Sequence, residues 1–306
     1  MSCLSWNCRG LGNPQTEAEL ADLIGKKDPK MVFLMETKVD MDVIEKISHK
    51  MQYKNYFVVP RHNRGGGLAL LWKETFAMKV LTSSNNHIDG VVDQGMDDAW
   101  RFTGFCGELE TASREHSWNL LRDLSHRHSL PWICLGDFNE ILKLEEKQGW
   151  LDRPKRQMQG FWDALDYCGF KDLGFNGYLF TWCNRRLGDH NVWIRLDHGV
   201  ATVDWFLQFP TSSVHHLECF HSNHRPILLI SNAEQKRFYR KGRPFRFEAM
   251  WLEDRSCEDV VKQSWANLFD SNSVSILLKK ITSCQVNLST WNRVTFGHVR
   301  NNWPRN

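Results

Sequence analysis

Polar side chains that can bind metal ions or transfer protons recur beside short apolar segments of this sequence. They are Asn7, Glu36, Asp137, Asn139, Asp197, Asn223 and His224. Carboxylate and amide oxygens suit hard cations such as magnesium or manganese. A histidine beside a carboxylate suits proton transfer. These residue types could therefore hold a divalent cation and move a proton in one site.

Each of these residues also has an ordinary structural explanation. Asn7 and Asn139 could cap turns that follow strands, and Glu36 could be an exposed strand end. Asp197 could pair only with a neighbouring arginine, and His224 could be a buried histidine whose hydrogen bonds are satisfied. Taken singly, the residues leave both explanations open; their order along the chain favours the chemical one.

Strand ends must position these side chains. Short runs rich in β-branched and aromatic residues alternate with segments of helical period, which is typical of a mixed α/β domain. A first short strand precedes Asn7. Further strand candidates cover residues 31–35, 56–59, 68–72, 100–105, 132–135, 178–182, 193–200 and 226–230. Most of them end beside a residue of the polar series.

Helices are expected between the strands. Thr16 and Glu19 form a capping-box pattern ahead of the first helix. Apolar stripes at 118–124 and 158–165 have helical spacing and are interpreted as core. Residues 261–269 and 276–291 mark two further amphipathic helices, with no obvious core of their own.

Composition limits the class of protein. Apolar residues make up 42% and charged residues 25%, which predicts a folded domain. A net charge of +3 is too small to indicate a nucleic-acid partner by itself. The nine cysteines form no CxxC pair, which favours reduced thiols in an intracellular protein. Neither a membrane span nor a secretory signal is recognisable, so we expect no membrane partner and no secretion.

The chain divides by composition into three parts. Residues 1–231 are expected to form the main domain, 232–251 a linker rich in basic and aromatic residues, and 252–306 a helical extension. Strand-like residues begin almost at Met1, and the sequence stops soon after the last helical segment. We therefore expect the chain to be part of a longer polyprotein.

The ordered motifs WNCRG, FLMET, GDFN, RLDHGV and SNHRPI resemble the endonuclease/exonuclease/phosphatase superfamily, which includes deoxyribonuclease I and the apurinic/apyrimidinic endonucleases. The match spans roughly residues 4–230. WNCRGLG, GGLALLW, WRFTGF, GDFNEI, FTWCN and PFRFEAMW look most like plant LINE (non-LTR) retrotransposon endonucleases. The resemblance implies an α/β (α+β) fold with two stacked mixed β-sheets flanked by helices, a four-layer α/β sandwich. A helical C-terminal extension would lead towards a reverse transcriptase.

The same resemblance implies roles for the polar series. Glu36, helped by Asn7, would hold Mg²⁺ or Mn²⁺. Asp137 would orient or deprotonate the attacking water, and Asn139 would hydrogen-bond the phosphate or that water. A phosphodiester requires such help because its anionic oxygens repel an incoming nucleophile.

His224 would contact the non-bridging phosphate oxygens or transfer a proton, and Asp197 would fix its tautomer. The family usually has aspartate at the position of Asn223, tyrosine at that of Cys106 and often arginine at that of His198. Asparagine lacks the full negative charge, so the resemblance implies weaker metal binding and slower turnover without misfolding. The chain then looks like a decayed copy of a mobile element.

The implied substrate is double-stranded DNA, nicked on one strand to leave a 3′-hydroxyl that primes reverse transcription. Candidate phosphate contacts are Arg61, Arg64, Arg185 and Arg186. Such a protein would be intracellular, and nuclear if functional. Two alternatives remain open: the same fold acting on a different phosphoester, or a catalytically dead module that binds DNA or protein.

Overall fold

The computed structural model describes residues 1–60, 66–231, 247, 251–252, 254–266 and 274–295. The chain forms two compact units, Met1–Ala233 and Glu234–Asn306. Arg61 and Arg64 lie outside the described residues, as does most of the predicted linker. All seven residues of the polar series, from Asn7 to His224, lie in the first unit.

The first sheet of this unit contains six strands in the order β14-β15-β1-β2-β4-β3. They are β14 (Ser213–His216), β15 (Ile227–Ile230), β1 (Ser2–Asn7), β2 (Met31–Met35), β4 (Leu68–Trp72) and β3 (Asn55–Val59). Strands β1 and β2 are parallel, with Asn7 opposite Met35, and the other neighbours are antiparallel. Because β1 and β2 end together, Asn7 and Glu36 emerge at the same edge.

The second sheet has the order β10-β13-β8-β7-β6-β5. Its strands are β10 (Phe170–Asp172), β13 (Asp197–Thr202), β8 (Trp132–Asp137), β7 (Trp100–Cys106), β6 (His87–Val92) and β5 (Met78–Ser84). The single parallel pair, β7 with β8, again lies in the middle. Asp137 is opposite Cys106 on one side and Asp197 on the other.

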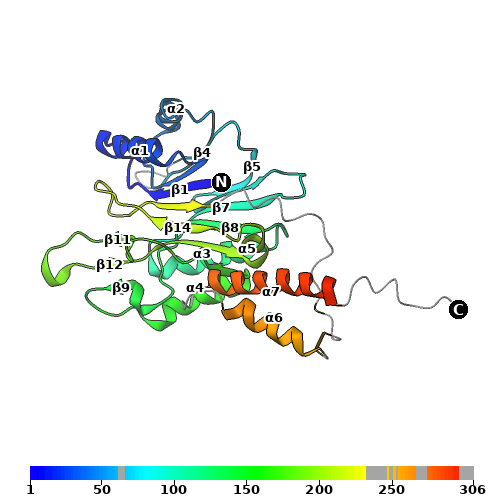
Figure 1. The fold of residues 1–306 in the computed structure, drawn as a ribbon. Helices are drawn as coiled ribbons and strands as arrows, with labels where there is room; N and C mark the ends of the chain where they lie inside the picture. Colours follow the sequence, from blue (N-terminus) through cyan, green and yellow to red (C-terminus); the bar gives the residue numbers. More distant parts are fainter. Residues whose placement is uncertain (61–65, 232–246, 248–250, 253, 267–273, 296–306) are drawn as a thin grey trace. The chain divides into compact units, whose positions relative to one another are not determined.

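The two sheets stack face to face between two layers of helices (Figure 1). Helices α1 (Pro14–Lys27) and α2 (Met41–Lys50) share one core cluster with the first sheet. Helices α3 (Arg114–Ser125) and α4 (Lys155–Tyr167) share another with the second sheet. Between the sheets, the rings of Phe33 and Phe102 meet edge to face at 6.3 Å. The predicted four-layer α/β sandwich is confirmed.

A third, small sheet has the order β11-β12-β9. Its strands are β11 (Trp182–Cys183), β12 (Trp193–Ile194) and β9 (Lys147–Gln148). An isolated bridge joins Trp182 to His224. This sheet is therefore connected through backbone pairing to the segment that carries the histidine. The remaining helix of the unit is α5 (Val203–Gln208).

The second unit contains α6 (Arg255–Ala266) and α7 (Val274–Thr295), so both predicted helices are present, with residues 267–269 of the first prediction outside the described residues. The expectation that they lack a core of their own is wrong. Trp251, Cys257 and Leu288 form a buried cluster, with Val261 packed against it. Among the described residues, no helix has the length and apolar character needed to cross a membrane.

Two predicted strands differ from the structure. The candidate at 178–182 forms a strand only at its end, because the chain turns at Gly177 (φ +107°) and the Tyr178 carbonyl hydrogen-bonds the His216 ring. The candidate at 193–200 is interrupted between Ile194 and Asp197, so its two halves belong to different sheets.

Two helix details also differ. The predicted capping box at Thr16 and Glu19 is wrong: α1 begins one turn earlier, where the Asn13 side chain accepts a hydrogen bond from the Gln15 N–H. Thr16 is buried inside that helix. In α4 the predicted core stripe holds except at Trp162, which is exposed and donates its indole N–H to the Leu142 carbonyl.

Candidate active site

Asn7 connects the two sheets at the centre of the site. It is fully buried at the end of β1, and its amide nitrogen donates to Glu36 Oε1 and to Asp137 Oδ2, each at 3.0 Å. Glu36 directly follows β2, and Asp137 ends β8 in the other sheet. One amide group thus holds together two carboxylates separated by about a hundred residues of sequence.

Glu36 is the carboxylate that remains accessible, with 21% of its side chain exposed. Lys38 Nζ lies 3.0 Å from Oε2, and Arg9 Nη1 lies 3.7 Å from Oε1. Burial alone would raise the pKa of Glu36, but the hydrogen bonds from Asn7 and Lys38 and the charges of Arg9 and Lys38 lower it overall. Glu36 therefore stays ionised at neutral pH.

A hard divalent cation fits the oxygen atoms at this position. The Asn7 Oδ1 atom is buried and has no hydrogen-bond partner among the described residues. Glu36 adds an ionised, partly exposed carboxylate beside it. Magnesium and manganese prefer such oxygen donors. Lys38 and Arg9 supply positive charge at the same carboxylate, so a bound cation would compete with them.

Asp137 and Asp197 lie side by side on adjacent strands of the second sheet. Both are buried, and they are paired residues of β8 and β13. The Asn139 N–H donates to Asp137 Oδ1 at 3.0 Å, and the Asn139 side chain donates to the Gly107 carbonyl at 2.8 Å. Asn139 thus fixes the loop after β8 and directs Asp137 towards the site.

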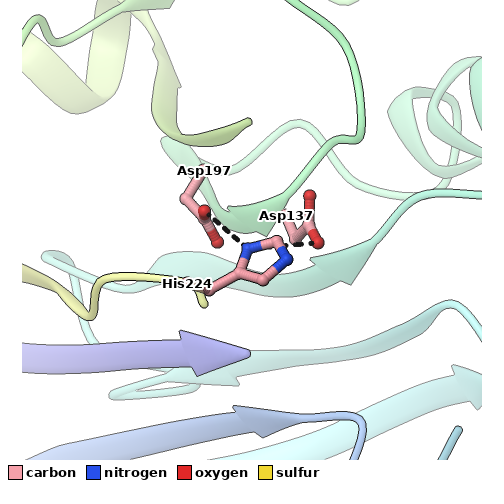
Figure 2. Close-up of side chains that lie close together, drawn as sticks. All are labelled: Asp137, Asp197 and His224. Atoms are coloured by element: carbon pink, nitrogen blue, oxygen red, sulfur yellow. Dashed lines mark hydrogen bonds and ion pairs between the residues drawn. The ribbon is translucent and has the colours of Figure 1, made fainter. Parts of the chain in front are cut away.

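His224 lies between the two buried aspartates (Figure 2). Its Nδ1 atom is 3.0 Å from Asp197 Oδ2 and 3.7 Å from Asp137 Oδ2. One ligand atom from each of these three residues lies within 4.8 Å of the others. Among the described residues Asp197 forms no ion pair with an arginine; its hydrogen bond to His224 fixes the orientation of the ring.

Burial and charge act in opposite directions on this group. Burial alone would lower the pKa of His224, but the carboxylates of Asp197 and Asp137 raise it overall. Burial also raises the pKa of Asp137 to about 6, although the neighbouring histidine opposes that shift. The arrangement therefore favours a protonated histidine between two acidic side chains.

Residues outside the predicted set hold the histidine in place. The Ser222 hydroxyl donates to the Asn7 carbonyl at 2.8 Å and accepts the His224 N–H at 3.1 Å. The indole N–H of Trp6 donates to the His224 carbonyl at 3.0 Å. Thr181 Oγ1 accepts the N–H of Asp197. Ser222 lies within the motif SNHRPI and Thr181 within FTWCN, and this position is the signal that could have identified them.

Two of the three departures from the expected family pattern, Cys106 and Asn223, lie beside this centre. Cys106 is the strand neighbour of Asp137. Burial, then the charges of Asp137 and Glu36, raise the pKa of its thiol well above the ordinary range, so the thiol stays neutral. The carbonyl of Asn223 accepts the Cys183 N–H, and its buried Oδ1 has no partner among the described residues.

A cavity of about 390 Å³ lies between the third sheet and the segment 219–225; the neighbours of His224 in the chain, Asn223 and Arg225, line it, but His224 does not. Asn223, Asn191, Trp182 and Arg186 are among its lining residues. Arg185, predicted to bind phosphate, donates from Nη2 to the carbonyls of Phe220 and Ser222 instead. Arg186 is exposed on the same loop. Phosphate binding by these arginines remains a prediction.

A second acidic cluster is structural. Glu146, Asp172 and His198 also lie within reach of one another, but the buried guanidinium of Arg195 pairs with both carboxylates at 2.7–2.9 Å. Burial, followed by the charge of Arg195, lowers the pKa of His198. Arg195 thus supplies the positive charge that a metal ion would supply there.

The fold and the site define a class of protein before any comparison is made. Two stacked mixed sheets carry an acid, amide and histidine cluster at the ends of their inner strands, the donor set needed to bind and cleave a phosphoester. Residues 4–215 match the endonuclease/exonuclease/phosphatase family. The chain belongs to this family of phosphoesterases. No relative is found among curated proteins.

Solved structures share the fold at low sequence identity. The chain is similar to an AP endonuclease from Archaeoglobus fulgidus, with a TM-score of 0.59 and 14% identity over 76% of this chain and 100% of that one. A 3′ phosphatase, NExo, from Neisseria, bound to a product DNA hairpin, gives 0.56 and 17% over 76% and 99%. The endonuclease domain of TRAS1, a telomere-specific non-LTR retrotransposon, gives 0.55 and 13% over 76% and 99%.

Proposed function

We propose that the chain is a divalent-metal-dependent endonuclease that nicks one strand of double-stranded DNA and leaves a 3′-hydroxyl, as in LINE retrotransposition. One observation carries the proposal. The Asn7 amide binds Glu36 and Asp137 at once, while Asp197 holds His224 against Asp137. An accessible carboxylate for a cation and a fixed, charged histidine thus lie in the same small centre.

Glu36 and Asn7 would hold the cation, Mg²⁺ or Mn²⁺, which when bound neutralises negative charge on the phosphate. Asp137, buried and hydrogen-bonded by Asn7 and by the Asn139 N–H, is suited to orient a water molecule and accept its proton. Because Asp197 occupies Nδ1 of His224, Nε2 is the nitrogen available to donate to a phosphate oxygen. A charged donor there offsets the negative charge that develops during cleavage.

Sequence motifs and structural relatives support the choice of DNA. A relative of the same fold is described as bound to a product DNA hairpin, and another is the endonuclease domain of a non-LTR retrotransposon. WNCRGLG, GDFNEI and PFRFEAMW favour the plant LINE subgroup. On this proposal the chain acts inside the cell, in the nucleus, and is continuous with or derived from a reverse transcriptase polyprotein.

A second candidate is an inactive module of the same fold that binds DNA or protein. Three observations favour it. Asn223 is neutral where a negative charge is expected, and Lys38 and Arg9 already pair with the carboxylate that would hold the cation. Cys106 adds a neutral thiol at the neighbouring strand end.

Plasmid nicking separates these candidates. Supercoiled plasmid is incubated with the chain and Mg²⁺ or Mn²⁺, with EDTA and His224→Ala as controls. We expect relaxed circles whose formation EDTA stops and His224→Ala slows by roughly 100-fold or more. A polymerase should extend the nick without end repair, because the 3′ end is a hydroxyl. DNA binding with no EDTA-sensitive nicking would support the inactive module.

A further inference from the structure

The loop between β9 and α4 exposes two large apolar side chains next to the site. Trp150 is 59% exposed and Leu151 is 76% exposed. Apolar side chains held together in solvent are unfavourable unless they contact a partner. The catalytic centre described above uses neither residue.

The backbone of the loop curls around one ammonium group. The Lys147 ammonium donates to the carbonyls of Gly149, Trp150 and Leu151. Leu151 adopts φ +59°, a strained conformation for a branched side chain, and such strain is common at functional positions. The three carbonyls thus point to one ammonium, while the side chains of Trp150 and Leu151 remain exposed.

The loop is packed directly against the hairpin loop that joins β11 to β12, residues 184–192, part of which lines the cavity. Gly149 has φ +107°, and a Cβ atom there would lie 2.4 Å from the Asn191 carbonyl oxygen. Asn191 lines the cavity that Asn223 and Arg225 also line. The Trp150 indole stacks on the His190 ring, with centroids 5.3 Å apart and planes at 14°. One face of the indole is thus supported, and the loop continues the wall of the site.

Basic residues lie on the hairpin loop against which Trp150 and Leu151, the apolar tip, are placed. Arg185 and Arg186 lie on the hairpin loop that also carries His190, and both are exposed. Strand pairing runs from Lys147 through Ile194 to Trp182, whose backbone bridges His224. Neighbouring strands are about 4.8 Å apart, so Lys147, at the start of the loop, is only a few strand spacings from the segment that carries the histidine. A polyanion with flat apolar faces matches this surface.

We propose that Gly149–Leu151 is a preformed wedge that contacts the bases of duplex DNA beside the cleaved bond. The inference rests on the proposed function and adds a binding element to it. The Trp150 indole stacks on a base exposed by opening of a base step, and the Leu151 side chain fills the space left in that step. Aromatic stacking and apolar wedges are general means of holding deformed DNA.

The test measures binding of 2-aminopurine-labelled duplexes by the full chain carrying His224→Ala, which slows cutting. Trp150→Ala should weaken binding on the order of tenfold and remove a fluorescence rise at one labelled step. Trp150→Phe should restore most of both signals. Leu151→Asn, which tolerates a positive φ, should weaken binding by a smaller factor.

Tyr167→Ala is the matched control, because Tyr167 is also an exposed aromatic residue paired with a histidine, His126, and lies on α4. It should bind like the parent. Equal binding and fluorescence for Trp150→Ala and parent would overturn the wedge while leaving nicking by the parent intact, and so would loss of self-association as the sole effect of Trp150→Ala. A parent chain that neither binds nor nicks DNA would overturn both proposals.

Discussion

At the scale of single residues, the site depends on side chains with two partners each. Asn7 binds one carboxylate from each sheet, and His224 lies between Asp137 and Asp197. The sequence order predicted which residues would meet, because each follows or precedes a strand. It could not predict that one amide would join Glu36 to Asp137, since that contact requires the two sheets to stack in register.

Asp197 is a positioning residue, so its replacement tests whether nicking depends on the orientation and charge of His224. Asp197→Asn removes the charge that holds the ring and stabilises its protonated form. We expect single-turnover nicking to fall by roughly 100-fold or more with the fold intact. By NMR, the pKa of His224 should also fall, because the Asp197 carboxylate raises it. A variant with parental nicking and an unchanged histidine pKa would contradict this role.

Replacement of Asn223 and Cys106 tests whether the chain is a weakened enzyme. Asn223→Asp returns a negative charge beside His224, and Cys106→Tyr supplies a hydroxyl donor beside Asp137. The double variant should nick plasmid faster than the parent and need less Mg²⁺ for half-maximal rate. The single variants identify which change matters. Nicking as low as in the parent would rule out decay at these positions as the cause of weak activity.

At the scale of elements, prediction succeeded where a strand is buried on both faces. Strands β2 and β4 match the predicted ranges 31–35 and 68–72, because continuous apolar runs leave little choice of boundary. Strands β5 and β6 were missed: β6 contains buried Asp89, neutralised by Arg101, and Gly90, which approaches the Lys79 backbone. Because β6 contains a charged residue and a glycine, its sequence shows no apolar pattern that would identify it as a strand.

The first helix shows how a tertiary contact misleads local analysis. Glu19 looked like the second half of a capping box, but its carboxylate accepts the N–H groups of Phe220 and His221 from the segment before the histidine. Asn13 and Pro14 start the helix instead. A partner about 200 residues away cannot be inferred from spacing within one turn.

Gly136 is required by the strand that carries Asp137. It has φ +152°, and a Cβ atom would lie 1.8 Å from the Phe105 carbonyl oxygen. Gly136→Ala should lower the free energy of unfolding by about 3 kcal/mol or more, measured by denaturant titration. Gly25→Ala is the control: it lies in α1 with open space around it and should stabilise by about 0.5–1 kcal/mol. Equal small effects would contradict the close approach.

At the scale of the whole molecule, buried histidines make stability depend on pH. Burial lowers the pKa of both His87 and His216 to about 4, against about 6.5 in the unfolded chain. Between those values the unfolded chain binds more protons. Stability is therefore present above pH 6.5 and is lost as pH falls towards 4, by on the order of 3 kcal/mol per histidine.

Denaturant titrations between pH 7 and 4 measure this loss. The double variant His87→Gln with His216→Gln should be less stable at pH 7, because both rings make hydrogen bonds, but its stability should change less with pH. The same steep loss in the parent and the double variant would show that other groups control acid unfolding.

The central claim is that side chains from five distant segments form one phosphodiester-cleaving centre. The most direct measurement compares single-turnover nicking by the parent with Glu36→Gln, His224→Ala and the double variant. Each single change should slow nicking by roughly 100-fold or more, and the double variant should be little slower than the worse single one, because the residues act as a unit. Unaltered nicking in either single variant, or losses that multiply fully in the double variant, would contradict a single centre.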